Sequence, residues 1–329
     1  EKNLYIDASH PEETRIVLKS KSSIEEYEFE DKNKLNFKNN IYLGTVSRVE
    51  PSLQAAFINF GRIKHGFLAF NDIQSDYYQI PLEDKERIKD AEEKIRENLK
   101  NKTVEDLSNE KKSDSLSEKL EDKNSIKSEE DVKKEYREEL KTSYGLKRYR
   151  IQEVIKPGQV ILIQVIKEER GQKGAALTTF ISLAGKYMVL MPNTPKGGGI
   201  SRKIFNSGDR QKIRSILNEI EIPKSMGVIV RTAGANKTKN EIEKDFKNTL
   251  KTWEEIGDKA LNSNAPSLVY EEGDIIKRTL RDTYDNETKN VYIHGNEAYQ
   301  KAKKFMKELM PRSLKNIKKY RGKVPLFHF

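Results

Sequence analysis

Residues 167–204, which read KEERGQKGAALTTFISLAGKYMVLMPNTPKGGGISRKI, contain the segment around which we expect the fold to form. The apolar run at 187–191, ended by Pro192, predicts a buried strand. The loop at 196–199 places three glycines after a lysine, and glycine lets an anionic group approach the backbone closely. This loop is therefore a candidate phosphate site; the alternative is that its glycines only turn the chain.

Length and composition limit the class of protein. A chain of 329 residues predicts about two or three domains of roughly 100–200 residues each. The net charge of +10 favours an anionic partner such as nucleic acid. The absence of cysteine excludes disulfides and thiolate metal sites, and it fits a reducing compartment. No apolar run is long enough for a transmembrane helix, and no signal-peptide core is present, so the sequence predicts neither a membrane span nor export.

The first 78 residues predict two groups of short strands. Strands are expected at 3–7, 14–18 and 24–29, and three strands bury so little that this group must pack on a later part of the chain. The second group, at 40–78, is broken by turn residues and predicts a small barrel. A strong strand expected at 160–166 would complete that barrel.

Four phenylalanines in the second group are candidates for contact with nucleic acid. Side chains alternate along a strand, so Phe57 and Phe60 should face opposite sides, as should Phe67 and Phe70. One member of each pair would fill the barrel, and the other would face outward. Outward aromatics among cations form a stacking platform for single-stranded bases, whereas the alternative is that every phenylalanine belongs to the core. The nearby cations are Arg48, Arg62 and Lys64.

Residues 82–141 differ abruptly from their surroundings in composition. They hold 16 Lys and Arg against 20 Asp and Glu, with no Gly or Pro, so the rest of the chain carries +14. A segment with so little apolar surface cannot form a core, and we predict a disordered insertion that leaves the barrel as a loop. A protruding charged helix or coiled coil is the alternative.

The remaining sequence predicts alternating helices and strands. Helices are expected at 209–219, 241–260 and 297–309, and the second of these carries Trp253 on its apolar face as a core anchor. Strands are expected at 226–232 and 289–293.

Two further features of this half bear on function and on chain ends. Arg231 and Thr232 stand where a strand ends, and a guanidinium fork beside a hydroxyl suits phosphate oxygens. The run at 323–329 has no cap or polar tail, so we expect Leu326, Phe327 and Phe329 to be exposed, as in a severed element.

None of the usual catalytic arrangements is present in the sequence. The four histidines lack metal-ligand spacing, and no Gly-x-x-x-x-Gly-Lys-Ser/Thr phosphate loop occurs. The residues themselves therefore favour binding of RNA or another single strand, together with a phosphate site.

Four segments carry a resemblance to a known family. They are residues 41–68 (IYLGTVSRVEPSLQAAFINFGRIKHGFL), 167–202, 227–234 (GVIVRTAG) and 322–327 (GKVPLF). In this order they resemble the N-terminal catalytic half of the ribonuclease E/G family of bacterial endoribonucleases. The resemblance covers the whole chain except the charged insertion.

The resemblance implies an α+β, multi-domain fold. An OB-fold β-barrel that binds RNA (38–180, with the disordered charged insertion at about 82–141) would be followed by an α/β sensor of the RNA 5′ monophosphate (181–274). A discontinuous ribonuclease-H-like subdomain (1–37 and 275–329) would flank them. The chain would then end before the DNase-I-like subdomain that holds the catalytic aspartates of the family.

The resemblance also assigns roles to residues. It implies that Phe57 and Phe67 stack on RNA, that Lys173 is a basic RNA contact, and that Arg231 and Thr232 grip the 5′ phosphate. The pocket would be completed by the backbone of Gly185, the apolar wall of Val189 and the supporting Arg202. Some positions depart from the family: Leu43 and Thr45 replace lysines, which implies weaker RNA affinity at that barrel edge, and Phe60 replaces the tyrosine of some members.

The function implied is that of an endoribonuclease, a hydrolase that cleaves single-stranded, often 5′-monophosphorylated RNA in mRNA decay and in rRNA and tRNA processing. The ligands of its magnesium and of a bridging zinc would lie beyond this chain, so no catalytic or metal-binding residue is implied here. The family further implies a homo-oligomer (a tetramer), degradosome-type protein partners, and a cytoplasmic location or one at the inner membrane face. The alternative is an RNA-binding module that does not cut.

Overall fold

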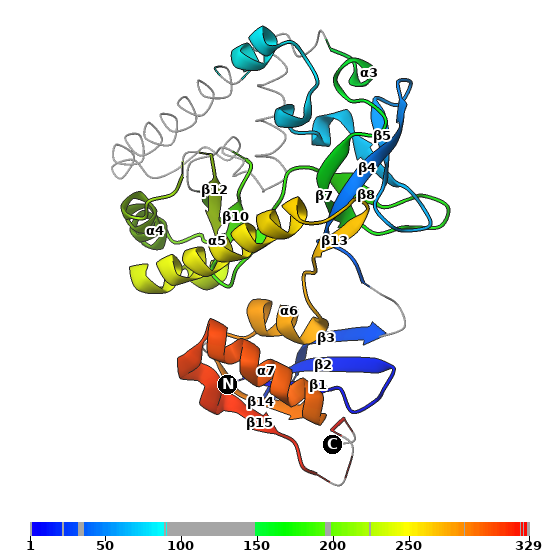
Figure 1. The fold of residues 1–329 in the computed structure, drawn as a ribbon. Coiled ribbons are helices and arrows are strands. Elements are labelled where there is room, and N and C mark those ends of the chain that lie inside the picture. Colours follow the sequence, from blue (N-terminus) through cyan, green and yellow to red (C-terminus); the bar gives the residue numbers. More distant parts are fainter. Residues whose placement is uncertain are drawn as a thin grey trace, which may run out of the picture. The chain divides into compact units, whose positions relative to one another are not determined.

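The computed structural model describes residues 2–21, 23–31, 36–88, 90, 149–194, 199–223, 225–285, 287–322, 324 and 326–327. The chain forms two compact units, whose helices and strands are labelled in Figure 1. Lys38–Tyr270 form the first, which we call the central unit. Glu1–Phe37 and Glu271–Phe329 together form the second, the terminal unit.

The terminal unit is a five-stranded sheet with two helices packed on one face. In sheet order the strands are β15 (Ile317–Lys319), β14 (Thr288–His294), β1 (Lys2–Asp7), β2 (Glu13–Ser20) and β3 (Ile24–Asp31). The helices are α6 (Ile275–Asp282) and α7 (Asn296–Leu309), and the 3-10 helix η5 (Pro311–Asn316) precedes β15. Because β1 pairs in parallel with β14, the N-terminal strands do pack on a distant part of the sequence, as predicted.

Alternation along the strands gives this sheet one covered face. Leu4 and Ile6 point into a core shared with α6 and α7, and Tyr5 points to the opposite face. Our prediction for Leu326 is wrong: this side chain is only 5% exposed, and Phe327 is half-buried, because both lie over that opposite face. Phe329 lies outside the described residues.

The central unit contains a closed five-stranded barrel, which is consistent with an OB-fold. Its strands are β4 (Ile41–Glu50), β5 (Ala55–Asn59), β6 (Gly66–Ala69), β8 (Ala176–Thr178) and β7 (Val160–Lys167). The pairing of β7 with β4 closes the barrel, which confirms the closing strand expected at 160–166. Three short helices lie between the barrel strands in sequence. The 3-10 helices η1 (Phe70–Asp72) and η2 (Ser75–Tyr77) follow β6, and α3 (Ile151–Val154) precedes β7.

A four-stranded sheet and two helices form the other half of the central unit. The strands, in sheet order, are β11 (Gly199–Ile200), β12 (Gly227–Val230), β10 (Met188–Met191) and β9 (Leu183–Ala184). The two α-helices are α4 (Ser207–Glu219) and α5 (Lys239–Leu261), and the 3-10 helix η4 (Thr232–Gly234) lies between β12 and α5. After α5, β13 (Ser267–Tyr270) returns to pair with β4. The strand predicted at 187–191 and the helices at 209–219 and 241–260 are thus confirmed.

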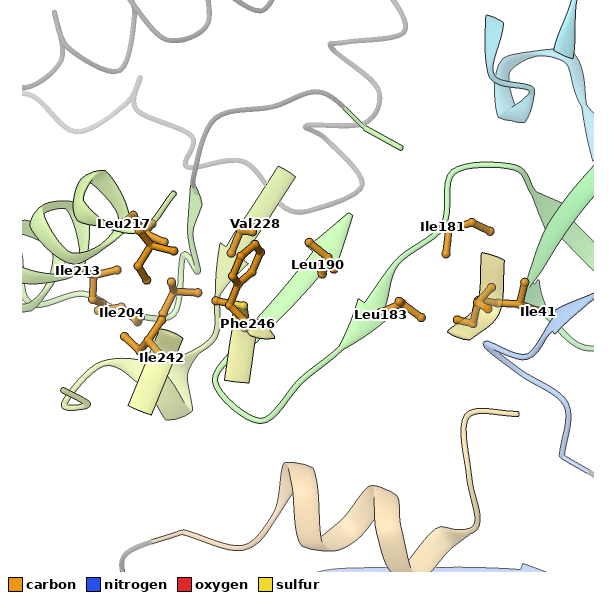
Figure 2. Packing of buried hydrophobic residues seen from close by; sticks show 14 of the residues in the cluster. Ile41, Ile181, Leu183, Leu190, Ile204, Ile213, Leu217, Val228, Ile242 and Phe246 are labelled. Atoms are coloured by element: carbon orange, nitrogen blue, oxygen red, sulfur yellow. The ribbon is translucent and has the colours of Figure 1, made fainter. Parts of the chain in front are cut away.

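The barrel and this second half share one hydrophobic core. Figure 2 shows its residues running from Ile213 of α4 past Phe246 and Leu190 to Ile181 and to Ile41, the first residue of barrel strand β4. All five are 5% exposed or less. Leu43 also packs against this cluster, which explains why an apolar side chain suits that barrel edge, and Trp253 packs on it half-buried.

Two predicted features fall wholly or partly outside the described residues. Residues 82–88 are helical, but apart from Asp90 the rest of the charged segment at 82–141 is not described. Of the glycine loop at 196–199, only Gly199 is described, as part of β11. Within the described part of the chain, no helix is long and apolar enough to cross a membrane.

Candidate nucleic-acid interface

Two phenylalanines form a pair on the outer surface of the barrel. Phe57 in β5 and Phe67 in β6 are direct cross-strand partners, with ring centroids 6.0 Å apart and ring planes at 76°. Their neighbours Ile58 and Leu68 are fully buried inside the barrel, so alternation turns both phenylalanines outward. Both rings are half-buried, which leaves part of each available for contact with a ligand.

Phe60 and Phe70, which were predicted to face the opposite side from Phe57 and Phe67, differ in burial. Phe60 is 1% exposed and packs edge-on against Tyr42, so the split between Phe57 and Phe60 is confirmed. The split between Phe67 and Phe70 is wrong. β6 ends at Ala69, so Phe70 begins a 3-10 helix, where the two-residue period no longer applies, and its half-buried ring lies against Tyr78.

One cation contacts the aromatic pair, and others lie on a neighbouring turn of the barrel. The guanidinium carbon of Arg48 lies 4.4 Å from the ring centroid of Phe57, within the range of a cation–π contact. Lys173 is exposed in a turn whose ends, Arg170 and Lys173, bridge to each other, and Lys64 Nζ donates to the Gly171 carbonyl oxygen in that turn at 2.6 Å.

Glycine at 174 lets this turn run beside β6. The Phe67 N–H donates to the Ala175 carbonyl oxygen at 2.7 Å, which holds the segment after Lys173 against the strand that carries Phe67. A Cβ at Gly174 would overlap the His65 carbonyl oxygen, so only glycine permits this approach. The structure therefore brings Phe57, Phe67 and Lys173 onto neighbouring segments of one barrel.

A second candidate site forms at the turn between β9 and β10. The buried carboxylate of Asp245, from α5, accepts the N–H groups of Lys186 (3.1 Å), Tyr187 (2.8 Å) and Met188 (3.2 Å). A Cβ at Gly185 would lie 2.5 Å from Asp245 Oδ2, so the turn approaches the carboxylate only because residue 185 is glycine. Burial raises the pKa of Asp245, although the three N–H donors and the charge of Arg231 act in the opposite direction.

Arg231 is held by the same turn. Its N–H donates to the Tyr187 carbonyl oxygen at 2.7 Å, and its Nη1 donates to the Gly185 carbonyl oxygen at 2.9 Å. Arg231 is half-buried, and the next residue, Thr232, is exposed at the start of η4. A preset guanidinium beside an exposed hydroxyl is an arrangement that can receive an oxyanion.

The remaining predicted pocket residues lie on the same sheet. Ser201 N–H donates to the Val230 carbonyl oxygen at 2.8 Å, and Arg202 and Arg231 are the residues that follow these two. Val189 is buried and pairs with Ala184 and with Ile229, and it faces away from the core side occupied by Met188 and Leu190. Gly185 and Arg231 are therefore in direct contact, whereas Val189 lies further along the strand.

Two contributors were not identified from the sequence. Asp245 orders the turn. The sequence gives one sign of this role: an acidic residue stands on the buried face of the helix, between Ile242 and Phe246. Lys237 places its Nζ 5.1 Å from the ring centroid of Tyr187 and adds a cation beside the turn. No local pattern in the sequence distinguishes this lysine from its many neighbours.

Metal binding finds no support in the described part of the chain. There, no group of three or more His, Cys, Asp or Glu side chains is placed to hold a metal ion. The resemblance places the ligands of magnesium and zinc beyond this chain, and that location stays a prediction.

The closed five-stranded barrel with outward aromatics defines the class of protein as one with an OB-like barrel. Residues 182–329 match the model of the Ribonuclease E/G family. Ribonuclease E of Haemophilus influenzae is 32% identical over 327 residues, which cover 99% of this chain and 28% of that protein. Ribonuclease E of Escherichia coli is also 32% identical over 327 residues, which cover 99% of this chain and 25% of that protein. Ribonuclease G of Escherichia coli is 25% identical over 317 residues, 96% of this chain and 53% of that protein.

This chain belongs to the Ribonuclease E/G family, and the matched relatives are named ribonuclease E and ribonuclease G. It spans 28% and 25% of the length of the two ribonuclease E relatives.

Proposed function

We propose that this chain is the RNA-holding and end-reading part of an endoribonuclease. The observation that carries the proposal is the cross-strand pair of Phe57 and Phe67 with Arg48 over one ring and Lys173 on the adjoining segment. Successive bases of a single strand stack on such rings, and the cations meet the phosphates between them. The central unit would then bind RNA with little dependence on sequence.

The turn at Gly185 supports a role as a sensor of the RNA 5′ monophosphate. The backbone N–H of Arg231 donates to the Tyr187 carbonyl oxygen, and its side-chain Nη1 donates to the Gly185 carbonyl oxygen. The second bond orders the guanidinium, so less side-chain entropy is lost when it binds an oxyanion. Thr232, Arg202 and Lys237 would supply the further donors. The exposed Thr232 hydroxyl would be the one that reaches the phosphate directly, while Val189 would close the apolar side of the pocket.

The end-reading claim is tested with two single-stranded oligonucleotides that differ only in a 5′ monophosphate or a 5′ hydroxyl. Fluorescence anisotropy should show tighter binding of the monophosphate, and Arg231→Ala should abolish the difference. Arg231→Lys should restore part of it, because the charge stays and the fork is lost. The exposed Lys259→Ala in α5 is the control for loss of one positive charge. Equal affinities of the unmutated chain for the two ends would refute a sensor.

The RNA-holding claim is tested with the same oligonucleotides and the barrel aromatics. Phe57→Ala and Phe67→Ala should each weaken binding of both oligonucleotides, by about 5- to 150-fold for stacking worth ~1–3 kcal/mol. Leu53→Ala is the matched control, since Leu53 is an apolar side chain of the barrel that is 59% exposed. If all three variants bind as the unmutated chain does, the aromatic pair is not the RNA surface.

The activity of the whole protein is part of the same proposal. It would be magnesium-dependent cleavage of single-stranded RNA in mRNA decay and in rRNA and tRNA processing, by a cytoplasmic homo-oligomer with degradosome-type partners. The terminal unit would correspond to the ribonuclease-H-like subdomain. A cleavage assay with magnesium separates this function from that of an RNA-binding module that does not cut.

A further inference from the structure

The outer face of the terminal unit's sheet carries a hollow that the RNA-binding function does not use. It has a volume of about 630 Å³, which lies within the range of small-molecule sites. We propose that it binds a mononucleotide, with the base stacked on a row of tyrosines and the phosphate beside Lys19 and Arg15.

The floor of the hollow is a row of side chains in register across four strands. Tyr292 of β14 pairs with Tyr5 of β1, Tyr5 pairs with Val17 of β2, and Val17 pairs with Tyr27 of β3. All four line the hollow, and the rings of Tyr5 and Tyr292 are nearly parallel, with centroids 5.4 Å apart and planes at 18°. The rings of Tyr5 and Tyr292 therefore stack on each other at one end of the row, and the exposed Tyr27 at the other end is the ring available to a planar ligand.

A second wall lies over this row. Leu326 and Phe327 line the hollow from the last described segment, and Tyr320 adds a third side chain. The Tyr320 hydroxyl donates to the Val324 carbonyl oxygen at 2.8 Å, a hydrogen bond within this C-terminal segment. A flat aromatic ligand would thus be enclosed between the tyrosine row and an apolar cover.

The hollow has cations where a phosphate attached to such a ring would lie. Arg15 and Lys19 flank Val17 on β2 and line the hollow, each about 7 Å along the strand from Val17 at ~3.3 Å per residue. Arg15 also forms an ion pair with Glu13, so the exposed Lys19 is the stronger candidate for the phosphate.

The combination of these groups selects the ligand class. A purely apolar ligand would leave the lysine and arginine without a role, and a free phosphate would leave the tyrosine row unused. A nucleoside monophosphate uses both, because its base stacks on aromatic rings and its phosphate pairs with cations.

Isothermal titration of the whole chain with adenosine 5′-monophosphate tests the proposal, beside adenosine and ribose 5-phosphate as half-ligands. Each half-ligand should bind at least tenfold more weakly than the nucleotide. If ribose 5-phosphate binds as tightly as the nucleotide, the tyrosine row does not hold the base and the proposal fails. The same conclusion follows if the nucleotide shows no binding.

Two exposed side chains allow variants that keep the fold. Tyr27→Ala should weaken nucleotide binding about fivefold or more, as expected for loss of a stacking contact. Phe29→Ala is its control, because Phe29 is 51% exposed on the same face of β3 but does not line the hollow, whereas Tyr27 is 59% exposed and does. Lys19→Ala should weaken the nucleotide but leave adenosine unchanged, and Lys21→Ala, in the following turn, is its control.

Arg231→Ala distinguishes this hollow from the proposed 5′-phosphate pocket. Nucleotide binding in that variant should stay within twofold of the unmutated chain, even though its preference for 5′-monophosphorylated RNA is lost. Loss of nucleotide binding in Arg231→Ala, with normal binding in Tyr27→Ala and Lys19→Ala, would place the nucleotide in the other pocket and overturn the proposal.

Discussion

Replacing Asp245 by alanine should both destabilise the central unit and disturb the site around Arg231. The carboxylate is the acceptor for three buried N–H groups, at 3.1, 2.8 and 3.2 Å, and alanine leaves all three without it. At ~1 kcal/mol for each lost hydrogen bond, the free energy of unfolding should fall by about 3 kcal/mol. Asp245→Asn should cost only about 1 kcal/mol, because its amide oxygen can still accept from Tyr187 and Met188.

Urea denaturation followed by tryptophan fluorescence measures this effect. Trp253 is the single tryptophan of the chain, and it packs on the core of the central unit from the same helix as Asp245. With a urea dependence of ~1–3 kcal/mol per molar, the midpoint should move down by about 1–3 M in Asp245→Ala. Asp258→Ala, which removes an exposed carboxylate of the same helix, should change stability by no more than ~0.5 kcal/mol.

The same variant has a functional consequence that the control lacks. The turn ordered by Asp245 supplies both carbonyl oxygens that hold Arg231, so Asp245→Ala should also reduce the preference for a 5′ monophosphate. The reasoning would be refuted if the midpoint of Asp245→Ala matched that of Asp258→Ala and the amides of residues 186–188 exchanged no faster than in the unmutated chain.

Further predictions concern pH, glycine and charge. Burial raises the pKa of Asp245, so the folded protein keeps this proton where the unfolded chain has lost it. Stability should therefore fall as pH rises from about 4 through the folded pKa, and Asp245→Asn should remove that dependence in urea titrations at several pH values. Gly174→Ala should destabilise by more than ~2 kcal/mol, because its Cβ overlaps backbone, whereas Gly257→Ala, in α5 with open space around it, should stabilise by ~0.5–1 kcal/mol; melting temperatures compare the two. Arg48→Ala should weaken RNA binding and lower the slope of log affinity against log salt by about 1, which titrations at several salt concentrations measure.

Local patterns predicted much of the secondary structure. The two-residue period placed Phe57 outside the barrel and Phe60 inside, and it held although β5 ends at Asn59, one residue before Phe60. The same rule failed at Phe70, because there the chain turns directly into a 3-10 helix, where the two-residue period does not apply. The expected exposure of Leu326 was also wrong, because its burial depends on a sheet formed from both ends of the sequence.

The candidate sites show the same limit. The sequence located Arg231 at a strand end, but it gave no reason to connect Arg231 with Gly185, which lies 46 residues earlier, or with the buried Asp245 of a later helix. The roles of these residues in binding a 5′ phosphate stay predictions. Their contact is a finding of the structure.

By itself, the sequence determined many of the helices and strands, the positive charge outside the acidic segment, and the family, since each is written in composition or in contiguous motifs. Only the tertiary structure decided which side chains meet. Closure of the barrel set the segment after Lys173 beside Phe67, α5 carried Asp245 to the turn at Gly185, and the pairing of β1 with β14 assembled the tyrosine row. The physical reason is that these contacts join residues distant in sequence, so no local pattern along the chain encodes them.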